Sequence, residues 1–498
     1  MADPQAMPPP DDEGTLARWE HTRTRRLMLK GNWEDAAEQR LQAFFAPEAM
    51  TTLPPAELSY NPFLSVVTQI SSLYDEEGAV EADGASDDDL DMVVSPVWWS
   101  QQQQTLEWTV GLNDCFVLTL FDTLRGFYYQ TVTPDVVEVE PDPRTPDQPG
   151  RFVWYDEQRR PGADDVVEWT RTTWDILPTL STPPGPAVYR VEAYVEQGDA
   201  HWEDVTAIYQ PALEGRYPLV DRAGDPIMPA VAYHRKLWAQ LLSPLPGREL
   251  VEGTLTTSTL MTHWVGGVRD GAHPLRYALD AEVSAGVTTT QHASGNRPGV
   301  RVVRADRTSI MQFRSLGDGT GSLGQWNPTM DPKSAGEAIA AYSAQLAVYA
   351  GVSPSDVSVK GSSGQSGYAI SISRDGQRRA RRKLIPPMRR SDELLFATAA
   401  RVLNGMGATT TLPEDAGDWM VRYAELPRSL EEVKADLEEA DRLRAAGVLG
   451  LVDYFLRFNS GLTREQAIEK MLENAREERE IEVALQALNA TEEGADDE

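Results

Sequence analysis

The most constraining feature of this sequence is the segment 331–407, where two helical patterns lie on either side of a polar loop. Ser334 is placed to cap the first helix with Glu337 as its capping-box partner, and Gly351 suits the left-handed residue that ends a helix. We therefore predict a helix over 334–350. Its apolar residues recur at intervals of three and four and form one stripe for packing: Ile339, Tyr342, Leu346 and Tyr349.

The second helical pattern of this segment carries the only dense basic run in the chain, and its prolines predict a kink. The basic residues are Arg374, Arg378, Arg379, Arg381, Arg382, Lys383, Arg389 and Arg390. They have two interpretations. Either they pair with some of the chain's 77 carboxylates, within one chain or across a subunit boundary, or they face nucleic acid, where each cation adds salt-sensitive attraction.

Composition narrows the function classes. The chain has 498 residues, enough for two to four domains, and a formal net charge of −31. Such a charge argues against a protein that wraps nucleic acid with most of its surface. The single cysteine, Cys115, excludes an internal disulfide framework and a cysteine zinc site, so we expect a reducing compartment. No signal segment or apolar run of membrane-spanning length is visible, so we expect an unexported protein.

Taken in order, the chain predicts helices followed by antiparallel strands, and hence the α+β fold class. Helices are predicted at 15–45, 61–74 and 98–108, and strands at 115–122, 126–132, 136–140, 151–155, 166–173, 188–195, 205–209 and 227–233. The segment 75–91 holds nine acidic residues and is expected to be a disordered or looped insertion. The first helix carries Arg23, Arg25, Arg26 and Lys30, either as a solvated face or as a DNA or partner contact.

The second half of the sequence predicts a small insertion between two helices. A helix is expected over 247–268, although its many threonines weaken helix propensity. The residues 273–330 form a compact mixed insertion, with a strand at 299–304 and a glycine-rich turn at 317–324. Beyond 407, the patterns predict a strand at 419–423, three helices at 430–446, 449–458 and 463–488, and an acidic tail.

No motif predicts catalysis, a metal or a cofactor. The glycine-rich segment 317–321 lacks the Gly-Lys-Ser/Thr of a nucleotide-binding loop, and 361–367 lacks the spacing of a nucleophile elbow. The histidines show no helical pair for a metal. The acidic run 87–91 lacks the glycine and glutamate positions of a calcium loop.

Short sequence segments and the order of the predicted elements together resemble those of the portal proteins of tailed bacteriophages. The most specific match is the turn Gly351-Val352-Ser353-Pro354, followed by Ser366-Gly367-Tyr368-Ala369-Ile370 at the start of a long helix. Shorter matches lie at 143–149, 251–255, 262–264 and 324–326. The resemblance covers about 41–475 and rests on recurring text and element order, with no catalytic signature.

The resemblance implies a portal architecture that assembles as a ring. It assigns an N-terminal arm and helix to 1–45, the wing to 46–245, the stem helices to 246–271 and 332–352, the clip to 272–331, the tunnel loop to 353–366, the long kinked wing helix and its strand to 367–428, and a helical crown to 429–498. The stem-helix stripes would then be buried against neighbouring subunits.

The same resemblance implies a non-enzymatic ring, a dodecamer, at one capsid vertex, which is assembled in the bacterial host cytoplasm and needs no cofactor. Double-stranded DNA would pass through it without sequence-specific contacts. Its implied partners are the terminase large subunit, a head-tail adaptor, and the major capsid protein or scaffold. The tunnel-loop residues facing the DNA would be Ser355, Asp356, Ser358, Lys360, Ser362, Ser363 and Gln365. Acidic subunits around a channel would repel DNA, which suits a channel that DNA must pass through without being bound.

Two alternatives stay open. One is a metal-dependent nucleic-acid-processing enzyme that uses the acidic run 87–91 for metal and the basic helix for substrate. The other is a different virion structural adaptor, which would lack an insertion between two long helices.

Overall fold

The structure is a computed structural model that describes the chain in ranges separated by gaps. The described residues are 8, 10, 13–44, 55–94, 97–122, 126–162, 166–181, 183–195, 201–213, 216–237, 240–242, 248–272, 275–279, 310–313, 322–326, 331–354, 367–408, 410–424, 430–458, 464, 467–476 and 479, with the backbone alone at several of them, including 270–272, 275–279, 310–313, 322–326 and 367–375. The chain divides into two compact units, one of Met1–Ser363 with Ser373–Glu425, the other of Gly364–Ile372 with Leu426–Glu498.

The first unit begins with helices. They are α1 (Glu13–Lys30), α2 (Glu34–Phe44), α4 (Pro62–Ile70), α5 (Asp87–Val93) and α6 (Trp98–Leu112). The single helix predicted over 15–45 is therefore wrong. Gly31 lies between α1 and α2 with a φ of 77°, a left-handed conformation that glycine adopts without the penalty of a Cβ, and it ends α1 there.

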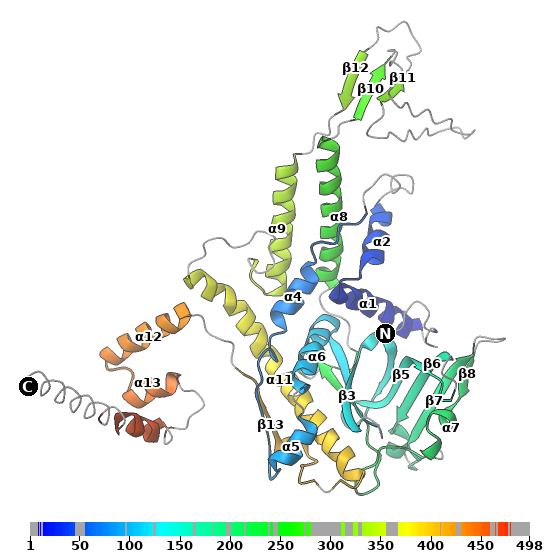
Figure 1. Cartoon of the computed structure of the whole chain (residues 1–498), viewed down its shortest axis with the longest axis vertical. Coiled ribbons are helices and arrows are strands. Elements are labelled where there is room, and N and C mark those ends of the chain that lie inside the picture. Colours follow the sequence, from blue (N-terminus) through cyan, green and yellow to red (C-terminus); the bar gives the residue numbers. More distant parts are fainter. Residues whose placement is uncertain are drawn as a thin grey trace, which may run out of the picture. The chain divides into compact units, whose positions relative to one another are not determined.

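Two antiparallel sheets follow (Figure 1). The first has the order β3-β2-β9, from β2 (Asp114–Asp122), β3 (Gly126–Val132) and β9 (Ala230–His234), and its β2–β3 pair is the predicted hairpin. The second has the order β4-β5-β6-β7-β8, from β4 (Val137–Pro141), β5 (Pro149–Arg159), β6 (Val167–Asp175), β7 (Val188–Val195) and β8 (His201–Asp204). These sheets and helices confirm the α+β class.

The strand predicted over 205–209 is wrong. The chain leaves β8 at Asp204, whose carboxylate accepts from the Thr206 backbone N–H at 3.0 Å, and the short helix α7 (Thr206–Tyr209) follows. The hydroxyl of Thr206 also accepts from the backbone N–H of Val191 at 2.8 Å. These side-chain bonds to the backbone favour a turn over continued strand pairing.

The two sheets share an aromatic core. Phe116 of β2 and Phe152 of β5 lie with ring centroids 5.2 Å apart, and Trp174 of β6 packs beside them. A larger core lies under the helices, where Trp98, Phe396 and Trp419 are buried together. Burial of such side chains contributes about 1.5–3 kcal/mol each to folding.

The acidic segment 75–91 is not the insertion that its composition predicts. It contains β1 (Ala79–Ala82), which pairs antiparallel with β13 (Trp419–Arg422), and α5, which Ser86 caps. Asp89 in the first turn of α5 is buried and accepts from the backbone N–H and the hydroxyl of Thr411. Carboxylates in the first turn of a helix stabilise it, which favours α5. The strand that pairs with β1 lies more than 300 residues away, so local composition cannot indicate it.

The insertion predicted between two long helices is present. Helix α8 (Arg248–Ala272) leads into β10 (Leu275–Leu279), and β11 (Ile310–Phe313) and β12 (Ser322–Trp326) precede α9 (Pro332–Ala350). The three strands form a sheet of order β11-β10-β12, parallel between β10 and β11 and antiparallel between β10 and β12. The predicted strand 299–304 and most of the turn 317–324 lie outside the described residues.

Helix α9 ends as predicted at Gly351, which has a φ of 78°, but its N-cap differs from the prediction. Asp331 caps the helix by accepting from the backbone N–H groups of Lys333 and Ser334, and Pro332 takes the first helical position. A capping aspartate followed by proline is as suitable as the predicted serine. Helix α11 (Gly367–Gly405) follows and continues through Pro386 and Pro387.

The second unit contains α12 (Leu430–Ala445) and α13 (Leu451–Phe458), which confirm two of its three predicted helices. Arg457 joins them through an ion pair with Glu439 at 2.8 Å. The third predicted helix is described only at 464, 467–476 and 479, where the backbone is helical. Short 3₁₀ helices elsewhere are η2 (Pro134–Val136), η3 (Leu177–Leu180), η4 (Pro211–Leu213) and η5 (Ala416–Asp418). Across the described ranges, no helix is both long and apolar enough to span a bilayer.

Candidate functional site

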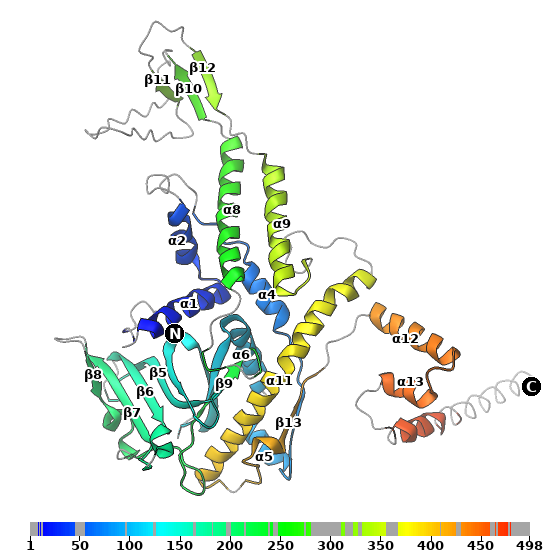
Figure 2. The ribbon, with the colours of Figure 1, turned by 180° about the vertical axis from the view of Figure 1, so that it is seen from behind.

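The pair of α8 and α9 lies side by side in both views of the chain (Figures 1 and 2). Gly253 of α8 faces Leu346 of α9 so closely that a Cβ on Gly253 would lie 2.4 Å from Leu346 Cδ2. Further along, Trp264 Nε1 donates to the carbonyl of Pro332 at 2.8 Å. The contacts run in opposite directions along the two helices, so the helices are antiparallel and closely packed.

The threonines that weaken the helix prediction for α8 bind a segment of backbone. Thr254 accepts from the backbone N–H of Phe63 at 3.1 Å, and Thr262 accepts from that of Glu57 at 2.9 Å. Ser258, between them, donates to the carbonyl of Glu57 at 2.7 Å. Spacings of four residues place the three hydroxyls on one side of the helix. They provide partners for three backbone groups, the N–H and carbonyl of Glu57 and the N–H of Phe63.

The apolar stripe predicted for α9 divides into two parts. Ile339 and Leu346 are buried within the single chain, and Leu346 packs on α8. Neither needs a neighbouring subunit for its burial, in contrast to what the resemblance implied. Tyr342 is half-buried against the same core. Tyr349 is 62% exposed and Val348 is 64% exposed, and this end of the helix therefore presents an apolar patch. A hydrogen bond with Glu249 of α8 raises the pKa of Tyr349.

The basic residues of α11 divide in the same way, and three of them are structural. Arg381 is buried and donates to the carbonyls of Ser72 and Ala424, so the expectation that it faces DNA or another subunit is wrong. Arg389 donates to the Val421 carbonyl at 3.0 Å, and Arg390 pairs with Asp147 at 2.8 Å. These bonds hold α11 to the rest of the unit. The bond of Arg390 is the predicted pairing with a carboxylate of the same chain, whereas those of Arg381 and Arg389 go to backbone carbonyls.

Three of the remaining basic residues are exposed on the same helix. Arg379, Arg382 and Lys383 are exposed, whereas Arg378 is half-buried and has a partner. The side chain of Arg374 lies outside the described residues, as do all seven predicted tunnel-loop residues, Ser355, Asp356, Ser358, Lys360, Ser362, Ser363 and Gln365. The exposed set is three cations on about one helical turn.

Sequence reasoning missed a buried carboxylate further along α11. Asp392 has no exposed surface and accepts hydrogen bonds from the hydroxyls of Tyr74, Tyr233 and Tyr423 at 2.7, 2.8 and 2.6 Å. Burial raises the pKa of Asp392 to about 7, against the lowering effect of the three hydroxyls. An aspartate in a basic helix gives no signal of this role, because its partners come from three other segments of the chain.

A second buried acid lies at the end of β2. Asp114 Oδ1 is 2.7 Å from His234 Nδ1, and the other ring nitrogen faces the carbonyl of Asp147 at 2.7 Å. Burial lowers the pKa of His234, but the bond to Asp114 outweighs it, so the net direction is upward. The pair is buried and both ring nitrogens are occupied, so this histidine is a structural link between β2, β9 and the segment near 147.

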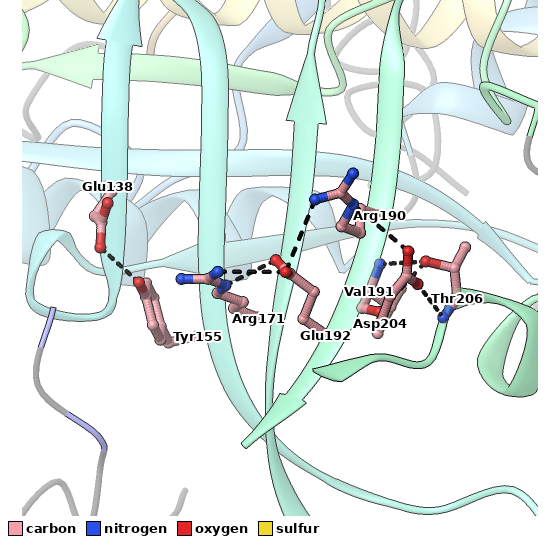
Figure 3. A network of polar contacts seen from close by, with 8 residues as sticks. All are labelled: Glu138, Tyr155, Arg171, Arg190, Val191, Glu192, Asp204 and Thr206. Carbon is pink, nitrogen blue, oxygen red and sulfur yellow. Dashed lines mark hydrogen bonds and ion pairs between the residues drawn. The ribbon is translucent and has the colours of Figure 1, made fainter. Parts of the chain in front are cut away.

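The five-stranded sheet carries a row of polar side chains across its strands (Figure 3). Tyr155 donates to Glu138 at 2.5 Å, and Arg171 donates to Glu192 at 2.8 Å. Arg190 lies 3.9 Å from Glu192 and 3.6 Å from Asp204. Cross-strand pairs of opposite charge stabilise a sheet, and because each arginine of this row has a carboxylate beside it, we assign the row to stability.

The acidic run predicted as a metal site in the enzyme alternative has another role. Asp89 accepts hydrogen bonds from Thr411, and the aspartates in the first turn of α5 stabilise the N-terminus of that helix. Within the described ranges, no group of three or more histidine, cysteine, aspartate or glutamate side chains is arranged to hold a metal ion.

Comparisons with known proteins add little to this picture. No family model matches the sequence, and no curated protein matches it. Among solved structures, the chain is similar to a chain of the "Virion of native gene transfer agent (GTA) particle", with a TM-score of 0.38 and 15% sequence identity over 81% of this chain and 90% of that one. A likeness at that level is too weak to carry an argument about fold or function.

Proposed function

We propose that this chain is the portal subunit of a tailed bacteriophage or phage-like particle, a ring that conducts double-stranded DNA. The observation that carries the proposal is the helix pair α8 and α9, closely packed and antiparallel, with a small three-stranded sheet inserted between them and the long helix α11 after them. This is the element order that the portal-like text at 351–354 and 366–370 implies.

Charge supports the same role. A net charge of −31 on each subunit repels a polyanion, so a ring of such subunits would surround DNA without holding it. The exposed cations Arg379, Arg382 and Lys383 are then the described basic groups placed to meet phosphate, together with the predicted tunnel loop. Contact with only a few exposed cations favours sliding of the DNA over tight binding of it.

Exposure supports oligomerisation. Val348 and Tyr349 on α9 would be buried against the next subunit of the ring, because a patch of large apolar side chains on a soluble chain marks an interaction surface. The resemblance further implies docking of the terminase large subunit, a head-tail adaptor, and the major capsid protein or scaffold. We include in the proposal that the chain binds these partners, forms a dodecamer and is located in the virion.

Electron microscopy of the purified full-length chain tests the proposal directly. We expect closed rings with a central hole wide enough for a DNA duplex, and mass photometry of the same sample should give one high-order species. A chain that stays monomeric over the accessible concentration range, with melting behaviour showing that it is folded, would rule out the portal role.

A further inference from the structure

A cavity of about 720 Å³ lies between α1, α2 and α8, away from the residues used above for DNA passage. Its volume is in the range of sites that hold small ligands or peptide side chains, about 300–1,000 Å³. It is lined by Gly14, Arg18, His21, Thr24, Arg25, Ala36, Gln39, Arg40, Ala43, Leu242, Val251, Glu252 and Leu255. Three arginines against one glutamate make this lining cationic, in a chain whose net charge is −31.

Two of the arginines, Arg18 and Arg25, lie on α1 and are held in position by backbone carbonyls. Arg18 donates to Val137 O at 2.9 Å, and the buried Arg25 donates to Gly111 O at 3.2 Å. Burial, with the neighbouring Arg235 as the second cause, lowers the pKa of Arg25 to about 10, so it stays charged at neutral pH. Because Arg25 is buried, it is not part of a solvated helix face, which was one of the two interpretations of the basic residues on this helix.

The third arginine, Arg40, has a carboxylate partner that a ligand can replace. Arg40 of α2 pairs with Glu252 of α8 at 3.3 Å, with side chains 32% and 40% exposed, and its guanidinium lies 5.1 Å from the ring centroid of Phe44. Exposed pairs of this kind contribute about 0–1 kcal/mol. A second carboxylate can therefore replace Glu252 on Arg40 at low cost, while the stacking on Phe44 keeps the guanidinium in place.

Part of the lining is apolar. Val251 and Leu255 of α8 are buried, and Ala36 and Ala43 of α2 lie on the other side. Leu242 completes the wall with a φ of 53°, a left-handed conformation that is uncommon for a leucine. Cationic groups beside an apolar wall suit a ligand that carries carboxylates and an apolar side chain together.

We propose that this cavity is a docking site for an acidic peptide segment of a partner protein, with carboxylates on Arg40, Arg18 and Arg25 and an apolar side chain against Val251 and Leu255. Guanidinium groups bind carboxylates through paired hydrogen bonds, which gives direction as well as attraction. The inference stands on this cavity alone and does not depend on ring assembly.

Nucleic acid is the other ligand that three arginines suggest, and the lining disfavours it. The chain's net charge of −31 repels a polyanion that extends beyond the cavity. A short peptide avoids most of that repulsion. The apolar wall also offers nothing to a sugar-phosphate backbone, whereas an aliphatic side chain gains from burial there.

Fluorescence anisotropy with the full-length protein tests the site. The probe is a labelled peptide of sequence Glu-Glu-Leu-Glu-Glu, with Gln-Gln-Leu-Gln-Gln and a labelled thymidine decanucleotide for comparison. We expect saturable binding of the acidic peptide, weakened by salt, and at least tenfold weaker binding of the glutamine peptide. Because the whole protein repels anions, saturable binding of this probe requires a local cationic site.

Two variants locate the binding, and a third controls for charge. Arg40→Glu should weaken binding about tenfold or more by placing a second acid in the cavity. Ala43→Trp, at an exposed position of α2, should do the same by filling the space. Arg379→Glu makes the same charge change at an exposed position of α11 and should leave binding within about twofold.

Three outcomes overturn the inference. The first is no saturable binding of the acidic peptide to a protein whose circular dichroism and melting are normal. The second is binding that Arg40→Glu and Ala43→Trp leave unchanged, which places it elsewhere. The third is tighter binding of the decanucleotide with the same dependence on Arg40, which makes the cavity a phosphate site. Ring formation is scored separately, so a failure here leaves the portal proposal unaffected.

Discussion

The hydroxyl of Tyr423 donates a hydrogen bond of 2.6 Å to Oδ2 of Asp392, a carboxylate with no exposed surface. Tyr74 shares the same oxygen and Tyr233 takes the other one. Asp392 therefore connects α11 to β9, to the segment after α4 and to the end of β13. A buried acid is tolerated there only because several donors replace its water.

Removal of one donor should destabilise this connection. Tyr423→Phe leaves the ring in place but deletes its hydroxyl, and we expect a loss of about 1–3 kcal/mol in the free energy of unfolding. Urea denaturation followed by fluorescence measures the change. Tyr349→Phe is the matched control, because Tyr349 is 62% exposed, and it should change stability by less than about 0.5 kcal/mol. Equal effects of the two variants would contradict a special role for the buried hydroxyl.

The charge of Asp392 should also give stability a pH dependence. Its pKa is about 7 in the folded chain, because of burial, and about 3.9 in an unfolded chain. A raised acid pKa means that the folded state binds the proton more tightly, so this contribution is complete below about pH 4 and is lost as pH rises through about 7.

Asp392→Asn removes this titration, since an amide stays neutral throughout. Urea denaturation of both proteins at pH 5 and pH 8 gives the test. We expect the wild type to lose more stability than the variant over that interval. His234 has a raised pKa and acts in the same direction in both proteins, so it cancels in the comparison. Parallel pH profiles would show that Asp392 does not titrate there.

The two arginines Arg381 and Arg379, two positions apart, should behave in opposite ways. Arg381→Gln leaves the carbonyls of Ser72 and Ala424 without their charged donor, and we expect a loss of about 1.5–3 kcal/mol. Arg379→Gln changes an exposed residue and should stay within about 0.5 kcal/mol.

In an assembled particle, glutamine at Arg379, Arg382 and Lys383 together should reduce the amount of packaged DNA while rings still form. Quantification of encapsidated DNA against ring yield separates the two effects. Normal packaging by the triple variant would remove these cations from the proposed channel surface.

Local patterns in the sequence predicted the elements but not the partners of their side chains. The hairpin of β2 and β3 and the helices α8, α9, α12 and α13 follow from periodicity and from turn or cap residues, which act over a few positions. The burial of Arg381 depends on Ser72 and Ala424, and the structured state of 75–91 depends on β13 and Thr411. Arg381 and Ala424 are 43 residues apart, and the other contacts join positions more than 300 residues apart, so composition within one window carries no trace of them.

The candidate site shows the same division. The threonines of α8 lower helix propensity when considered alone, and only the backbone at Glu57 and Phe63 explains why they are there. The cavity between α1, α2 and α8 was equally out of reach, because its arginines come from α1 and α2 and its apolar wall comes from α8. The helices were visible in the sequence, whereas their juxtaposition was not.

The close approach of α8 and α9 predicts contrasting effects for two glycines. Gly253→Ala places a methyl group 2.4 Å from Leu346 Cδ2, so the helices must separate or Leu346 must move, at a cost of about 1–3 kcal/mol. Gly336→Ala has a nearest contact of 3.7 Å, with Trp264 Nε1, and should stabilise α9 by about 0.5–1 kcal/mol through helix propensity. Thermal denaturation of both variants decides; a neutral Gly253→Ala would mean that the helix pair adjusts freely.

The apolar patch at the end of α9 predicts a variant that folds but does not assemble. Val348→Glu with Tyr349→Glu changes two side chains that are 64% and 62% exposed in the single chain, so the monomer should stay folded, weakened only by the lost hydrogen bond between Tyr349 and Glu249 and by screened repulsion between Glu249 and the new acid at 349. In a ring, the same change would bury two uncompensated charges against a neighbour, which costs several kcal/mol for each subunit contact. We expect mass photometry to show the variant as a monomer under conditions where the wild type forms rings. Met406→Glu, at a 45% exposed position in the turn after α11, is the control for an added charge and should assemble normally. If the double variant forms rings as well as the control does, the subunit contact lies elsewhere on the molecule and the exposed end of α9 must be explained by another partner.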